Sequence, residues 1–148
     1  MTSFFPDVNV WLAVVVQDHS HNTPAVEWIG SVKDDDLLVF SRFTQMGLLR
    51  LLTNQAAMGA QTLSLGQAWN AFDECMEDSR IHFRPEPYGV DAAFRQVSAP
   101  LAKLSASKGV GDSFLIAFAQ QSGATLVTFD KALWTQARKS ACAAIIPR

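Results

Sequence analysis

Short apolar runs alternate with longer amphipathic segments along almost the whole chain, and no other feature constrains the fold as strongly. Apolar runs of this length are typical of strands that are buried on both faces of a parallel sheet. The expected strands span residues 3–5, 37–40, 81–83, 125–129 and 143–146. Between them, apolar residues recur at three- and four-residue spacing, as in helices that cover a sheet. The sequence therefore predicts an α/β fold with a mostly parallel sheet of four or five strands flanked by helices.

The size and composition of the chain fit one folded domain over residues 1–148. Its 49% hydrophobic and 18% charged residues exclude intrinsic disorder and low-complexity structure. Twelve basic residues against fourteen acidic ones give a formal net charge of −2. Because no overall positive field attracts nucleic acid, a function on nucleic acid would need a local basic patch or bridging metal ions.

The cysteines and apolar runs predict a soluble, cytoplasmic protein. Cys75 and Cys142 form no CxxC pair and no zinc-binding spacing, so we expect both thiols to be reduced. The apolar run at residues 10–16 is far shorter than the ~20 residues that span a bilayer. No basic segment precedes that run, so a signal peptide and a membrane partner are not expected.

Three aspartates occupy positions where a parallel sheet places its ligand sites. Asp7 follows the first expected strand, Asp130 follows the strand at 125–129, and Asp112 stands at the expected start of a helix. Ligands bind beyond the carboxyl ends of such strands, so the three carboxylates are expected at one rim of the sheet. Their mutual repulsion favours a divalent cation between them, and oxygen ligands favour Mg²⁺ or Mn²⁺.

Two of these aspartates also have a purely structural interpretation. Asp112 is a suitable N-cap for the helix that follows it, and Asp130 is suitable as a turn residue or as the cap of a short helix. Asn9 is expected to cap the helix that runs to Val16. Asp7 is the hardest of the three to explain in this way, because no turn is required where it lies.

Four segments of the chain, in this order, carry a resemblance to a known family: residues 5–10 (FPDVNV), 44–54 (TQMGLLRLLTN), 111–115 (GDSFL) and 126–131 (LVTFDK). They resemble the corresponding segments of PIN-domain ribonucleases, and in particular of the VapC-type toxins of bacterial toxin–antitoxin pairs. The resemblance extends from Phe4 to about Leu133, which is nearly the whole chain.

The resemblance implies a PIN fold and an endoribonuclease that cuts RNA with Mg²⁺ or Mn²⁺. It implies that Asp7 and Asp112 are the main metal ligands and that Asp130 completes the site directly or through water. Asn9 and Thr128 are implied as hydrogen-bonding neighbours of these acids. A cognate VapB-type antitoxin that neutralises the toxin, and a homodimer, are implied as partners.

One departure from the family concerns a glutamate that most PIN nucleases carry on the helix after the second strand. Here that stretch offers Gln45 or Gly47, and the sequence leaves open which of them takes the place. Arg42 and Arg50 flank this position and are candidates for contacts with RNA phosphates, or alternatively for a surface or salt-bridge role.

The missing glutamate leaves a second function open, a PIN-like binding module that does not cleave. A third hypothesis is a metal-dependent phosphohydrolase, because Asp7-Val8-Asn9 resembles the nucleophilic segment of haloacid-dehalogenase-like phosphatases. The second aspartate of that motif is Asn9 here, which counts against it.

Overall fold

Five parallel strands form one sheet in the computed structural model, which describes residues 1–148. The order across the sheet is β3-β2-β1-β4-β5, so β1 is central. The strands are β1 (Ser3–Pro6), β2 (Leu37–Phe40), β3 (Ile81–Phe83), β4 (Thr125–Val127) and β5 (Ala144–Ile145). The chain builds outward from β1 to β3 and then returns to the other side of β1, so the switch point at which such sheets bind ligands lies between β1 and β4. The predicted α/β class is confirmed.

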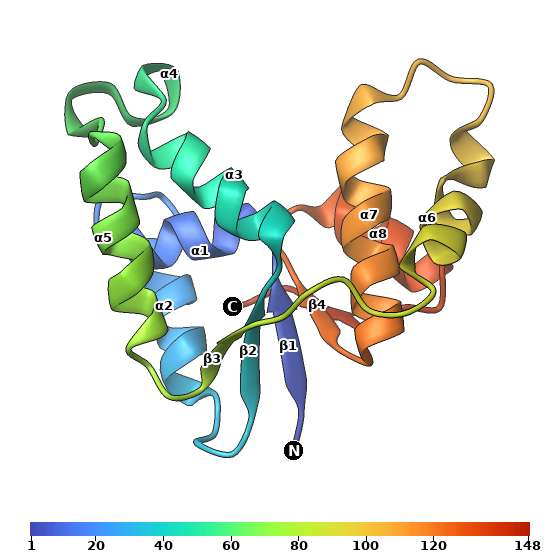
Figure 1. Cartoon of the computed structure of the whole chain (residues 1–148), viewed down its shortest axis with the longest axis horizontal. Helices are drawn as coiled ribbons and strands as arrows, with labels where there is room; N and C mark the ends of the chain where they lie inside the picture. The colour runs from blue at the N-terminus through green and yellow to red at the C-terminus, as the bar shows by residue number, and fades with distance from the viewer.

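The helices form two layers, one on each face of the sheet (Figure 1). One layer contains α1 (Val8–Val15), α2 (Asn22–Ser31), α3 (Arg42–Leu52) and α5 (Leu65–Met76), and the other contains α6 (Val90–Ser98), α7 (Ser107–Ser122) and α8 (Lys131–Lys139). Short turns complete the connections: α4 (Gln55–Met58), η1 (Gly59–Gln61) and η2 (Ala99–Leu101). None of these helices combines the length and the hydrophobicity that a bilayer crossing needs.

Strand β2 shows how the apolar runs build both layers. Leu38 and Phe40 are fully buried in the core beneath α1, α3 and α5, where the Phe40 ring stacks on Trp11 with ring centroids 4.0 Å apart. Val39 points to the opposite face and joins the core beneath α7, which contains Phe118. Because successive side chains of a strand alternate between faces, an unbroken apolar run supplies both cores at once.

The helix that follows β1 begins earlier than the sequence analysis predicts. Asp7, and not Asn9, is the N-cap of α1, and its Oδ1 accepts a hydrogen bond of 3.1 Å from the Val10 backbone N–H. Asn9 lies inside the first turn and is exposed. A capping side chain bonds the N–H two or three residues after it, which Asp7 does and Asn9 cannot do for this turn.

Helix α7 begins at Ser107, several residues before the expected start near Gly111. Gly109 lies where this added turn packs on Leu101, and a Cβ atom there would come within 2.5 Å of Leu101 Cδ1. Asp112 is therefore inside the helix, and its interpretation as an N-cap is wrong. The longer helix also places Asp112 one turn after Lys108.

Both cysteines are free, as expected from their spacing. Cys142 is buried and Cys75 is partly buried, and burial raises the pKa of each thiol to about 11. At neutral pH both side chains are therefore protonated thiols that serve as packing residues.

Candidate active site

The three aspartates singled out in the sequence surround the switch point of the sheet. Asp7 comes directly after β1, Asp130 begins α8 shortly after β4, and Asp112 lies on α7. Two bridging side chains connect them: Thr128 joins Asp7 to Asp130, and Lys108 joins Asp130 to Asp112. The structure therefore brings residues from distant parts of the chain into one connected polar group.

The Asp7 carboxylate is the buried member of this group, with only 4% of the residue exposed. The Thr128 hydroxyl donates a hydrogen bond to Oδ2, and the Val10 backbone N–H donates to Oδ1. Burial raises the pKa of Asp7, the hydrogen bonds from Thr128 and Val10 oppose this rise, and the negative charge of nearby Asp130 adds to it. No basic side chain pairs with Asp7, so a cation bound beside it would favour its charged form.

Asp130 combines a structural contact with a contact in the acidic group. Its Oδ1 caps α8 by accepting from the backbone N–H groups of Ala132 at 2.9 Å and Leu133 at 3.2 Å. Its Oδ2 accepts from Lys108 Nζ at 2.9 Å, and this bond is the main reason why the pKa of Asp130 is lowered. The backbone N–H of Asp130 donates to Thr128 Oγ1 at 3.0 Å. The predicted helix cap and the predicted member of the acidic group are thus the same residue.

Lys108 is the site residue that sequence reasoning missed. Its Nζ lies 3.0 Å from Asp112 Oδ2 and 2.9 Å from Asp130 Oδ2. Its hydrogen bonds to Asp130, the larger contribution, and to Asp112 raise the pKa of Lys108 to about 12. The ammonium is therefore charged at neutral pH. The only signal in the sequence is the four-residue spacing to Asp112, which is informative once α7 is known to begin at Ser107.

The donor set suits a hard divalent cation. Every candidate ligand is a carboxylate oxygen, and Mg²⁺ and Mn²⁺ prefer oxygen ligands. The Lys108 ammonium already stands between two of these carboxylates, which shows that the position attracts a cation. In this arrangement no three His, Cys, Asp or Glu side chains enclose a single metal position, so ligation by all three aspartates needs side chains to move.

The predicted neighbours of the acids differ in where they lie. Thr128 is fully buried between Asp7 and Asp130 and bonds to both. Asn9 is exposed, and its side chain forms no hydrogen bond with Asp7, Asp112 or Asp130. The structure thus supplies one of the two expected orienting neighbours.

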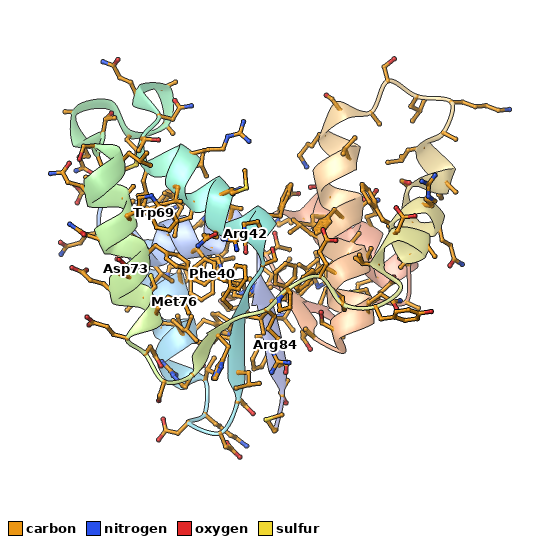
Figure 2. The ribbon with its side chains drawn as sticks, in the orientation of Figure 1. Phe40, Arg42, Trp69, Asp73, Met76 and Arg84 are labelled. Atoms are coloured by element: carbon orange, nitrogen blue, oxygen red, sulfur yellow. The ribbon has the colours of Figure 1, made fainter.

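Helix α3 separates the two candidates for the missing glutamate. Gln45 is buried and its Oε1 accepts from Arg42 at 2.5 Å, while the Arg42 guanidinium lies 4.5 Å from the centre of the Phe83 ring. Figure 2 shows Arg42 at the start of α3, just past the end of β2. Gly47 instead packs against Val8, the residue after Asp7, and a Cβ atom at Gly47 would lie 2.6 Å from Val8 Cγ2. Position 47 is therefore the one directed at the start of α1.

Arg50 lies one turn further along α3 and is exposed. It lines a surface hollow of about 400 Å³ together with residues of α1 and α3 that include Val8, Phe43 and Gly47. Arg50 forms no ion pair, so of its two alternative roles the structure shows a plain surface position and no salt bridge. Its contact with RNA phosphates stays a prediction.

Comparison with known proteins connects this geometry to a family. The sequence matches the PIN domain over residues 4–139. It is also 35% identical over 130 residues to ribonuclease VapC41 of Mycobacterium tuberculosis, and the match covers 85% of this chain and 88% of the relative. The chain belongs to the PIN-domain family of VapC-type ribonucleases.

Solved structures have the same fold as this VapC-type chain at low sequence identity. VapBC-1 from nontypeable Haemophilus influenzae superposes with a TM-score of 0.73 at 14% identity and covers 98% of both chains. VapBC2 from Rickettsia felis, bound to a DNA fragment from its promoter, gives a TM-score of 0.68 at 12% identity and covers 99% of this chain and 100% of that chain. At these identities the likeness confirms the PIN fold.

The family membership confirms the resemblance drawn from the four sequence segments. It also decides against the phosphohydrolase hypothesis, because that hypothesis rested on a single short motif around Asp7. The family membership concerns the class of protein, and the roles of Asp7, Asp112 and Asp130 stay predictions.

Proposed function

We propose that this VapC-type chain is a metal-dependent endoribonuclease toxin whose cleavage centre consists of Asp7, Asp112 and Asp130. One observation supports the proposal above all others. The buried Asp7 carboxylate, which has no ion-pair partner, is connected through Thr128 to Asp130, and Asp130 shares the Lys108 ammonium with Asp112. Acids with perturbed pKa values that gather at a switch point are typical of functional sites.

The proposed cofactor is Mg²⁺ or Mn²⁺, held by Asp7 and Asp112, with Asp130 as a direct ligand or one that acts through water. When bound, such an ion supplies hydroxide from water near neutral pH and stabilises charge on the phosphoryl oxygens. The chain's own contribution is orientation. Thr128 and the Val10 N–H fix both oxygens of Asp7, and the N-terminus of α8 fixes one oxygen of Asp130.

We propose further that Gly47 occupies the place of the usual family glutamate. A side chain at position 47 would extend towards Val8, the residue after Asp7, which supports this assignment. The Gln45 side chain instead accepts a hydrogen bond from Arg42. Glycine offers no ligand, so the centre has three carboxylates and binds one metal ion per chain. Titration calorimetry with Mn²⁺ should give a stoichiometry of about one, and a value near two would contradict this.

The proposed partners are the RNA substrate, a cognate VapB-type antitoxin and a second copy of the chain in a homodimer. The VapBC structures that share this fold support the antitoxin. On the surface of this chain, α3 and α5 expose large apolar side chains of the kind that interfaces bury, among them Met46, Leu65 and Trp69. Figure 2 shows Trp69 on α5.

Induced expression tests the proposal against the silent binding module, which the lack of an acid at positions 45 and 47 favours. We expect wild type to arrest growth and to leave discrete RNA fragments. The double variant Asp7→Asn/Asp112→Asn should accumulate as folded protein without either effect. Equal growth and intact RNA in both strains, with folded protein present, would favour the silent module.

A further inference from the structure

Charge is divided unevenly along this chain. Residues 97–148 contain six Lys and Arg against two acidic residues, whereas residues 1–96 contain six against twelve. The two acidic residues of the basic part are Asp112 and Asp130, and both are already bound by Lys108. The layer of α7 and α8 therefore presents positive charge beside the acidic centre, although the whole chain is negative.

Part of this positive charge lies on one face of helix α8. Lys131, Thr135 and Lys139 recur at four-residue spacing, and all three are exposed. The first and the last are eight residues apart, which is about 12 Å along the helix axis. Neither lysine forms an ion pair, so both ammonium groups are free to bind a partner.

This face of α8 forms one wall of a hollow of about 670 Å³. The opposite wall consists of Val97 from α6 and of Pro100 and Leu101 from η2. Lys131, the residue directly after Asp130, lines the hollow, so the hollow adjoins the acidic centre. In Figure 1, α6, α7 and α8 lie together on one side of the sheet.

We infer that this hollow holds the backbone of the single-stranded RNA on one side of the cleaved bond, with phosphates at Lys131 and Lys139. The inference rests on the proposed ribonuclease function. A substrate strand continues beyond the bond that is cut, and the aspartates of the centre repel its neighbouring phosphates. A positive wall that adjoins the centre offsets this repulsion, and the apolar wall suits sugar and base faces.

Equilibrium binding of RNA tests the inference without cleavage. The full chain carrying Asp7→Asn is titrated into a short fluorescent single-stranded RNA of mixed sequence, and anisotropy is followed at several salt concentrations. The variants Lys131→Gln and Lys139→Gln are compared with Lys33→Gln, which removes the same charge from an exposed position in the acidic part of the chain. A poly-glutamate peptide serves as a second, protein-like polyanion.

Each lysine that contacts a phosphate should lower the slope of log affinity against log salt by about 0.7, which is about a fivefold loss of affinity at about 0.1 M salt. The double variant Lys131→Gln/Lys139→Gln should lose about twice that slope, and Lys33→Gln should match its parent. Equal RNA binding by the double variant and its parent would overturn the inference but leave the proposed function standing. Lysine-dependent binding of poly-glutamate without lysine-dependent binding of RNA would assign the hollow to a protein segment instead. Failure of the parent to bind RNA at all would overturn the proposed function as well.

Discussion

Burial of the Asp7 carboxylate lowers the stability of the folded protein when the side chain is charged and no cation is bound beside it. Its pKa in the folded chain is raised above that of the unfolded chain, so the folded state binds the proton more tightly. The contribution of Asp7 to stability is thus greatest below the ordinary carboxyl pKa and is lost as the pH rises through the raised value. Without metal, the cost of ionising the buried Asp7 side chain therefore makes the folded protein less stable at neutral pH than at acidic pH.

Asp7→Asn should therefore stabilise the metal-free protein at neutral pH while it abolishes RNA cleavage. Asparagine keeps an oxygen for the Val10 N–H and carries no charge to bury. We expect the melting temperature to rise by a few degrees, since 1 kcal/mol corresponds to about 2–4 °C in a chain of this size. Thermal unfolding in EDTA checks this at neutral and at acidic pH, where the gain should vanish. A lower melting temperature at neutral pH would show that burial of the Asp7 charge is not the dominant effect.

Lys108 is expected to compete with the metal ion for Asp112 and Asp130. Exposed ion pairs contribute little to stability, so the ammonium can leave, but a metal ion must displace it. Lys108→Gln should tighten Mn²⁺ binding by about threefold to tenfold, corresponding to two weak ion pairs that no longer need to break. Calorimetry measures this directly. The control is Lys103→Gln, since Lys103 is exposed and forms no ion pair. Unchanged or weaker binding in Lys108→Gln would contradict the competition.

At the scale of secondary-structure elements, the close packing of α3 against α1 depends on Gly47, which has no side chain. A Cβ atom there would lie 2.6 Å from Cγ2 and 3.2 Å from Cγ1 of Val8, so either the Val8 side chain or the two helices must shift. Overpacking typically destabilises by about 1–3 kcal/mol, which outweighs the roughly 1 kcal/mol that alanine gains over glycine in a helix.

We therefore expect Gly47→Ala to lower the free energy of unfolding by about 1 kcal/mol. Val8→Ala should restore most of this loss, because it removes both methyl groups. Urea unfolding of the two single variants and the double variant measures the coupling. Additive effects in that cycle, or a more stable Gly47→Ala, would show that the helices can move apart.

The sequence predicted the positions of the strands better than the start of helix α7. The short apolar runs predicted the strands, most clearly β2, because a strand buried on both faces needs an unbroken run. The edge strand β3 interrupts its run with the exposed His82. The start of α7 was missed, because it depends on Gly109 packing against Leu101, a contact between separate elements that local pattern does not reveal. Without that start the spacing of Lys108 and Asp112 has no meaning, so the ion pairs of the site were missed with it.

At the scale of the whole molecule, topology decides which residues meet. The order β3-β2-β1-β4-β5 places the ends of β1 and β4 side by side, and therefore Asp7 beside Thr128 and Asp130. The positions of the strand ends in the sequence predicted this convergence, and the family resemblance implied that the site cleaves RNA with a metal ion. The positive layer around α8 was not predicted, because net charge conceals an uneven distribution along the chain.

Cleavage of RNA by the purified chain is the most direct test of the central claim that Asp7, Asp112 and Asp130 form a metal-dependent nuclease centre. With Mn²⁺ present, wild type should cut RNA, EDTA should stop the reaction, and added Mn²⁺ should restore it. Asp112→Asn should fold, as judged by circular dichroism, and show no cleavage. Full cleavage by folded Asp112→Asn, or undiminished cleavage by wild type in EDTA, would contradict the claim.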